Sequence, residues 1–438
     1  MTDLAEATTV AREQGDGRYA WIIGGALLAL IGGGAASYPI AAIGVVLMAM
    51  GALRWITVDR GLRGLVVSRR FERDRVICGD AVELVLTVRN RDPLPIPWLR
   101  VAEALPTALQ LTLADHGSPS DSGASQIAGL AELRNGWTLA PYRRITRRLR
   151  LVAGHRGVHR FDLVDVSAGD LLGRTIGHEE RSMPLTLIVR PRIVATAALD
   201  ARHDWSGERP TRTGRVDDPS RFAGVRPYAS GDPVRRLHWR ATARLGQPVV
   251  KRFDPARERD VLIVLDIETR AEDGRRSGDD DRHAEADRLE ELYIVAASLA
   301  RRFEAAGAAC GLAAAAFAGH GRQITFLAPG GSAGQSGRIG DLLARLGSFP
   351  SGSFPAMLGA MAHFVRPGTQ LVVVTARDPR PSLATARQLA RSGFAVEIVA
   401  LGPAAIEHAR QARRVGLAAR AVRLDADWRT SRALELVG

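Results

Sequence analysis

The sequence predicts a multidomain protein with two N-terminal transmembrane helices, a β-sandwich and a doubly wound α/β domain. Three observations lead to this fold class. Residues 19–56 are apolar with Arg54 as the only charged side chain, the following region carries short segments of alternating polarity, and the last part alternates apolar strands with helical segments. A chain of 438 residues is also too long for one ordinary hydrophobic core.

The changes in composition and period place the boundaries. The expected segments are a cytoplasmic tail at 1–18, a transmembrane hairpin at 19–56, a β-sandwich at 64–195, a linker at 196–259 and an α/β domain at 260–438.

The apolar run at 19–56 is too long for one membrane-spanning helix, because the hydrocarbon layer is only about 30 Å thick. Two spans at 19–36 and 39–55 solve the length problem, with a turn between them. The turn has no charge, whereas arginines crowd the far side of the second span: Arg54, Arg60, Arg63, Arg69, Arg70, Arg73 and Arg75. This asymmetry predicts a plasma-membrane protein whose termini and soluble domains are cytoplasmic.

The region after the apolar run has the period of strands. Val82, Leu84, Leu86 and Val88 alternate with residues of mostly higher polarity. Further strands are expected at 98–103, 144–152, 158–166 and 185–190. Many short strands without helical segments predict a small β-sandwich.

The last region predicts a mainly parallel sheet covered by helices on both faces, with its ligand edge at the C-terminal ends of the strands. Strands are expected at 261–266, 309–317, 323–328, 371–375, 395–400 and 420–424. Helices are expected at 287–306, 339–346, 355–364, 382–392 and 404–415.

Composition and motifs do not indicate an enzyme. No phosphate-binding P-loop, zinc-protease helix or serine nucleophile elbow is present, and the two cysteines, Cys78 and Cys310, are far apart. The formal net charge of +13 permits contact with nucleic acid, but no nucleic-acid motif accompanies it.

The most informative stretch is 221–254, which packs Arg, Asp, His and Trp together with Lys251, the only lysine of the chain. A helix is expected from Asp232 and Pro233 to Leu245, ending at Gly246. The stretch resembles the signature of the bacterial domain of unknown function 58 family. The matching positions are Arg226, Tyr228, Gly231, Asp232, Arg235, His238, Trp239, Ala243, Arg244 and Lys251.

These motif residues have two interpretations. They form either a polar cluster that joins neighbouring domains or an exposed docking patch with arginines at its rim. His238 is read as a packed helix histidine rather than a general base.

The resemblance extends to both soluble domains. Residues 79–90 resemble the opening of an immunoglobulin-like sandwich, and the α/β domain resembles a von Willebrand factor A-like fold, in which the first strand leads into magnesium ligands. The corresponding positions here are Asp266, Glu268, Arg270, Ser353 and Asp378. Because Arg270 would place a positive charge where the ion lies, no metal and no cofactor are expected. The alternative is Mg²⁺ held by the carboxylates.

The expected function is therefore a non-enzymatic, membrane-anchored adaptor at the bacterial inner membrane. The resemblance implies an AAA+ ATPase of the MoxR type as its partner, in a chaperone-like or cell-envelope role. Two alternatives stay open: a metal-dependent hydrolase using Asp266, Glu268 and Asp378, and membrane-proximal nucleic-acid binding through the arginine-rich surface.

Overall fold

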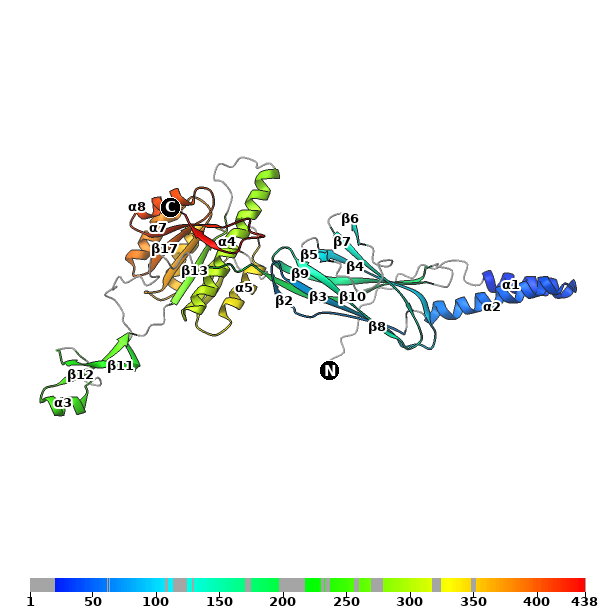
Figure 1. Cartoon of the computed structure of the whole chain (residues 1–438), viewed down its shortest axis with the longest axis horizontal. Helices are drawn as coiled ribbons and strands as arrows, with labels where there is room; N and C mark the ends of the chain where they lie inside the picture. The colour runs from blue at the N-terminus through cyan, green and yellow to red at the C-terminus, as the bar shows by residue number, and fades with distance from the viewer. Residues whose placement is uncertain are drawn as a thin grey trace. The chain divides into compact units, whose positions relative to one another are not determined.

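The structure is a computed structural model. It describes residues 20–60, 62, 64–106, 109–112, 124–127, 130–169, 175–196, 217–229, 232, 237–255, 260–268, 279–316, 324–347 and 352–437. The chain divides into two units, Met1–Arg190 and Pro191–Gly438 (Figure 1).

The described part of the first unit starts with two helices, α1 (Ala20–Gly34) and α2 (Tyr38–Arg60), which pack closely against each other. A Cβ atom added to Gly44 would lie 2.3 Å from the backbone nitrogen of Ala29. Such a distance is shorter than real Cβ contacts, so the helices approach this closely because glycine stands at the crossing.

No helix among the described residues is long and apolar enough to cross a membrane. The 15 residues of α1 rise about 22 Å at 1.5 Å per residue, less than the hydrocarbon thickness of about 30 Å. The 23 residues of α2 include Arg54, Asp59 and Arg60. The predicted transmembrane hairpin is therefore wrong, and so are the fold class that contained it and the predicted inner-membrane location.

Two antiparallel-rich sheets follow in the same unit. The four-stranded sheet has the order β1 (Leu65–Phe71), β3 (Ala81–Asn90), β8 (Arg144–Ala153), β5 (Leu109–Thr112). The six-stranded sheet has the order β2 (Arg75–Ile77), β10 (Thr175–Arg190), β9 (Gly157–Gly169), β4 (Ile96–Pro106), β7 (Leu130–Leu139), β6 (Ala124–Ile127). Alternate side chains of both sheets form one core, including Leu86, Val88, Leu99, Leu139 and Val166.

A buried ion pair ties the two sheets together. Arg69 on β1 forms a salt bridge with Glu103 on β4, and their side chains are 1% and 3% exposed. Arg69 also donates from Nη2 to the carbonyl oxygens of Phe161 and Met183, at 2.7 and 2.5 Å. Burial raises the pKa of Glu103, although the charge of Arg69 opposes this. Arg69 thus lies in the sandwich core and is not part of a charged flank next to the apolar helices.

The second unit contains a seven-stranded sheet in the order β15 (Thr325–Gly330), β14 (Ala309–Ala314), β13 (Asp260–Asp266), β16 (Gln370–Thr375), β17 (Ala395–Ala400), β18 (Ala418–Leu424), β19 (Leu434–Leu436). The five strands from β14 to β18 are parallel, whereas β15 and β19 pair antiparallel at the edges. The strand expected at 323–328 is therefore present, but as an antiparallel edge strand.

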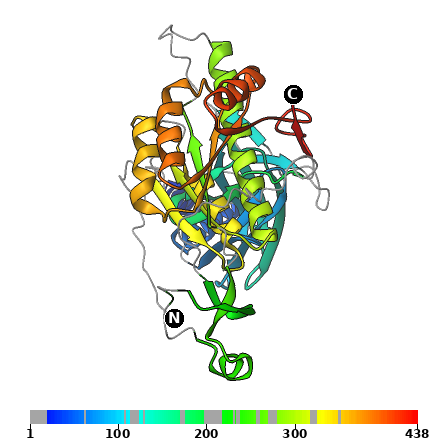
Figure 2. The ribbon, with the colours of Figure 1, turned by 90° about the vertical axis from the view of Figure 1, so that its left-hand side faces the viewer.

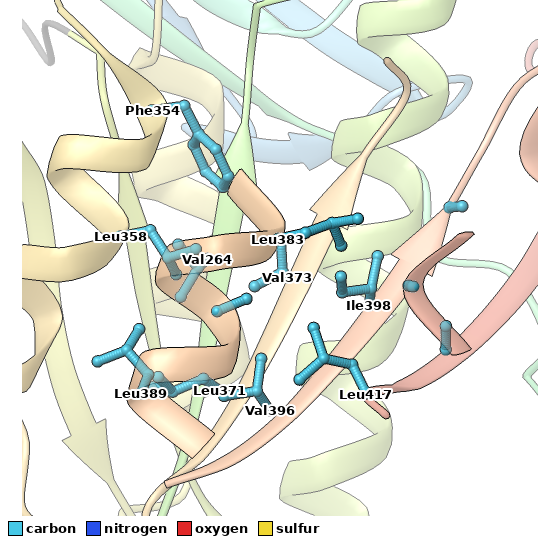
Figure 3. Packing of buried hydrophobic residues seen from close by; sticks show 14 of the residues in the cluster. Val264, Phe354, Leu358, Leu371, Val373, Leu383, Leu389, Val396, Ile398 and Leu417 are labelled. Atoms are coloured by element: carbon cyan, nitrogen blue, oxygen red, sulfur yellow. The ribbon is translucent and has the colours of Figure 1, made fainter. Parts of the chain in front are cut away.

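Five helices accompany this sheet: α4 (Asp279–Ala305), α5 (Gln335–Arg345), α6 (Phe354–Phe364), α7 (Arg380–Arg391) and α8 (Ala405–Arg414). The last three share a core with one face of the sheet, in which Val264, Leu358, Val373, Leu389 and Ile398 pack together (Figure 3). Helix α4 contacts β13, β14 and β16, and it lies beside α5 on the other face (Figure 2).

The connections diverge between β13 and β16, which are neighbours in the sheet. After β13 the chain moves to β14 on one side, and after β16 it moves to β17 on the other side. Right-handed crossovers in opposite directions place α4 and α7 on opposite faces. The C-terminal ends of β13 and β16 are thus the topological switch point, where open α/β sheets bind ligands.

Candidate functional site

The motif stretch folds as a small module, here called the motif module and made of the described residues 217–229, 232 and 237–255. Strands β11 (Asp217–Pro227) and β12 (Val249–Pro255) form a two-stranded antiparallel sheet. The short helix α3 (Trp239–Leu245) precedes β12. Two valines of β12, Val249 and Val250, are buried at 2% exposure each.

Arg226 and Asp232 hold the turn after β11. Two guanidinium nitrogens of Arg226 donate to the two carboxylate oxygens of Asp232, at 2.7 and 2.6 Å. Asp232 also accepts from the backbone N–H of Ala229 at 2.9 Å. This two-pronged geometry is the arrangement in which arginine binds carboxylate most strongly. The carboxylate of Asp232 is therefore engaged with the strand before it.

The helix begins later than the sequence predicted. Leu237 forms a β-bridge with Val250, so the chain is extended there, and α3 starts at Trp239. His238 is its N-cap and accepts from the N–H of Ala241 through Nδ1 at 3.1 Å. The prediction that the helix starts at Asp232 is wrong, because Leu237 is extended and His238 is the N-cap, and Pro233 lies outside the described residues.

The C-terminal end of α3 agrees with the prediction. Gly246 has φ 67°, a left-handed conformation that glycine adopts without a steric penalty, and its N–H bonds to Thr242 O. Thr242 Oγ1 in turn accepts from Val249 N at 3.1 Å, which ties the helix to β12. The polar atoms of His238 and Thr242 thus contribute hydrogen bonds to the fold of the module.

Several motif side chains remain accessible. Trp239 is 68% exposed and Leu245 is 56% exposed, whereas Tyr228 is 38% exposed. The cations Arg244 and Lys251 are also exposed. Gly231 and Arg235 lie outside the described residues. The motif module therefore combines an internally bonded frame with an exposed apolar and basic surface.

A second cluster lies at the switch point of the sheet. Asp266 ends β13, Thr375 ends β16, and the two residues are register partners. Thr375 Oγ1 donates to Asp266 Oδ2 at 2.9 Å. Arg377 donates to the same oxygen from Nε at 2.8 Å, and its Nη1 lies 2.7 Å from Glu268 Oε2. The guanidinium of Arg377 thus sits between two carboxylates.

Burial decides the electrostatics of this cluster. The side chains of Asp266 and Arg377 are 3% and 13% exposed. Burial raises the pKa of Asp266, and the charge and hydrogen bond of Arg377 and the hydroxyl of Thr375 counteract the rise. The second oxygen of Asp266, Oδ1, is buried without a hydrogen-bond partner.

The residues that the sequence analysis proposed as metal-site positions have different bonding partners in the structure. Asp266 and Glu268 are brought together through Arg377, which the sequence analysis did not select. Asp378 instead accepts from Nε of Arg380 at 2.5 Å. Ser353 is the exposed N-cap residue of α6, and Arg270 lies outside the described residues.

Over the described part of the chain, no group of three His, Cys, Asp or Glu side chains is placed to hold a metal ion. Arg377 could have been found from its position two residues after the end of an apolar strand, next to the edge that carries Asp266. The cluster can bind through charge and hydrogen bonds, and it offers few unengaged carboxylate oxygens to a cation.

Comparison with known proteins finds a similar family for the region that includes most of the motif module. Residues 224–353 match the family model described as "Protein of unknown function DUF58". This region of the chain is similar to that family. A curated relative, "Uncharacterized protein YeaD" of Bacillus subtilis (strain 168), is 25% identical over 253 residues, which cover 58% of this chain and 56% of that protein. The chain thus matches little more than half of this relative.

Two solved structures are similar to part of this chain. A non-cellulosomal cohesin from Archaeoglobus fulgidus is 10% identical with a TM-score of 0.20, covering 28% of this chain and 90% of the cohesin. The E. coli alpha-2-macroglobulin is 17% identical with a TM-score of 0.22, covering 29% of this chain and 9% of that protein.

Proposed function

We propose that this protein is a non-enzymatic adaptor that binds a protein partner through the motif module. The observation that carries the proposal is the exposure of Trp239. Its side chain is 68% exposed, while the neighbouring His238 caps the helix that presents it. A large aromatic side chain held on a fixed element is the kind of residue that dominates protein interfaces.

The surroundings of Trp239 support the same function. Arg240 and Arg244 are exposed and four residues apart on α3, so they lie on one side of the helix next to Trp239. Tryptophan and arginine are the residue types most enriched among side chains that contribute strongly to binding. An isolated two-stranded sheet is only marginally stable in water, so the β11–β12 pair also gains stability from any partner that covers it.

The resemblance to the DUF58 family supplies the expected partner, an AAA+ ATPase of the MoxR type. The von Willebrand factor A-like arrangement inferred from the sequence belongs to the same proposal. In that arrangement, Arg377 bonds to Asp266 and Glu268 and so occupies the position at the sheet edge that a cation would need.

The alternative of a metal-dependent hydrolase has less support. It requires Asp266, Glu268 and Asp378 to act together, yet Asp378 bonds to Arg380 and the other two carboxylates bond to Arg377. Nucleic-acid binding would use the same exposed Trp239, Arg244 and Lys251, but no nucleic-acid-binding motif accompanies them.

The proposal is tested by titrating the full chain with a purified MoxR-type ATPase from the same organism. Trp239→Ala should weaken binding about 30-fold, because truncating a dominant interface residue costs about 2 kcal/mol or more. The control is Tyr142→Asn. Tyr142 is 66% exposed and has φ 55°, a backbone conformation that asparagine also adopts. No binding by the unaltered chain, or equal losses in both variants, would refute the proposal.

A further inference from the structure

The outward face of the four-stranded sheet carries an unusual concentration of positive charge. Along β8, Arg144, Thr146, Arg148 and Arg150 are exposed, whereas Leu149 and Leu151 between and beyond them are buried. Successive side chains of a strand point to opposite faces, so these exposed residues share one side.

The strand registers extend this charge across the sheet. Arg89 on β3 lies directly opposite Arg144, and Glu83 lies opposite Arg150. On β1, Arg70 pairs with Val85, which in turn lies opposite Arg148. The group is called here the basic sheet face and consists of Arg70, Arg89, Arg144, Arg148 and Arg150.

Two acidic residues lie at one end of this face among the described residues: Glu83 on β3, and the exposed Glu72, whose backbone N–H bonds to the carbonyl oxygen of Glu83. Glu83 approaches Arg148 at 3.4 Å, with side chains 39% and 72% exposed. For the other four arginines the described part of the chain provides no ion pair. The contact between Glu83 and Arg148 is exposed and weak, so the face keeps a strong net positive charge.

This arrangement has a cost for the fold. Residues directly opposite each other on neighbouring strands have Cβ atoms about 4.5–5.5 Å apart, and like charges at such positions are destabilising. Arg89 and Arg144 occupy such a pair. A surface that served only solubility would interleave the two signs of charge. The repulsion between these arginines is relieved when an anionic surface covers them.

We infer that the basic sheet face is a docking surface for an acidic protein surface. The guanidinium fork fits carboxylates with two parallel hydrogen bonds, and several forks on a flat sheet match a row of Asp and Glu side chains. None of the described residues pointing to this side of β1, β3 and β8 is aromatic, so bases have nothing to stack on. A flat sheet face also offers no helix or ribbon to enter a DNA groove. The inference is independent of the motif module, which belongs to the other unit.

The test uses the full chain and a triple variant, Arg144→Gln, Arg148→Gln and Arg150→Gln. Fluorescently labelled poly-L-glutamate is the probe, and binding is followed by anisotropy at about 50 mM and 200 mM salt. The variant should bind at least tenfold more weakly at low salt. Its thermal unfolding temperature should be unchanged or higher, because repulsion on the face has been removed.

A matched control removes equal charge elsewhere. Arg387, Arg391 and Arg414 are exposed on α7 and α8 in the other unit, and their replacement by Gln should change binding less than twofold.

Three outcomes would overturn the inference. The unaltered chain fails to bind poly-L-glutamate, or the control variant loses as much affinity as the triple variant. The third outcome is that duplex DNA of 20 base pairs or phosphatidylglycerol vesicles bind more tightly than poly-L-glutamate and lose that binding in the triple variant.

Discussion

Replacement of Arg377 by Met tests the electrostatic account of the sheet edge. Methionine keeps much of the volume of the arginine stem but removes the guanidinium that bonds to Asp266 and Glu268. The carboxylate of Asp266 would then lie buried without a positive partner. Breaking a buried ion pair by removing one partner costs about 3–5 kcal/mol.

The exposed fractions of Asp266 and Glu268 indicate how much each carboxylate contributes to this cost. The side chain of Asp266 is 3% exposed, so nearly all of its loss is felt. The side chain of Glu268 is 35% exposed, and solvent screening limits its share to less than about 1 kcal/mol. The hydrogen bond from Thr375 remains. We therefore expect Arg377→Met to lower the free energy of unfolding of the α/β unit by about 3 kcal/mol at neutral pH.

The cost should depend on pH in a defined direction. Burial already raises the pKa of Asp266, and loss of Arg377 raises it further. A carboxyl whose pKa is higher in the folded than in the unfolded state binds more protons when folded. Its contribution to stability is therefore greatest below the unfolded pKa of about 4, and it declines as the pH rises toward the folded pKa. The deficit of Arg377→Met should shrink as the pH is lowered toward about 4.

Hydrogen exchange of the full chain provides the assay. The amides of β13 and β16 are register partners at the cluster, and their protection reports on the free energy of opening this part of the sheet. The control is Arg380→Met. The side chain of Arg380 is 72% exposed, so losing its pair with Asp378 should cost less than about 1 kcal/mol.

A double variant makes the test independent of simple loss of packing. Asp266→Asn combined with Arg377→Met removes both charges, so the combined cost should fall short of the sum of the single costs by about 1–3 kcal/mol. Additive costs, or an Arg377→Met cost no larger than that of Arg380→Met, would refute the reasoning.

Three further predictions concern other parts of the chain. Glu103→Gln leaves the buried Arg69 without a countercharge. Urea unfolding followed by circular dichroism should show that the free energy of unfolding of the sandwich falls by about 3 kcal/mol. A loss under about 1 kcal/mol would contradict the role of this ion pair in joining the sheets. Gly246→Ala forces a side chain into a left-handed conformation and should destabilise α3 by about 1 kcal/mol, seen as faster amide exchange over that helix, whereas unchanged exchange would argue against the cap. Burial raises the pKa of the Cys310 thiol to about 12, so the native protein should not react with Ellman's reagent at this site at pH 8, and rapid labelling by peptide mapping would count against the burial.

Local sequence pattern was sufficient to predict features that lie within a single strand or turn. The apolar strand expected at 261–266 is present as β13, one residue longer, and ends at Asp266. The alternation from Val82 to Val88 lies in β3. Gly246 ends α3 as expected. These features depend on a continuous apolar run, on alternation with a period of two, or on a backbone angle that glycine adopts easily.

Local pattern was not sufficient where a side chain bonds to a residue outside its own segment. The helix start was assigned to Asp232, whose carboxylate is held by Arg226, while His238 provides the cap. Arg69 was counted among surface charges although Glu103, far away in sequence, pairs with it in the core. The apolar run near the N-terminus was read as a membrane hairpin, whereas no helix among the described residues is long and apolar enough to span a membrane.

The sequence by itself determined the order of strands and helices in the α/β unit, because each element carries its own hydrophobic period. It also determined that acidic residues end β13 and follow it. Only the tertiary structure decided what those carboxylates do. Arg377 lies more than a hundred positions after Asp266, and parallel pairing of β13 with β16 brings the two within 2.8 Å. Sheet registry and burial, which join residues distant along the chain, set the charge balance of this edge.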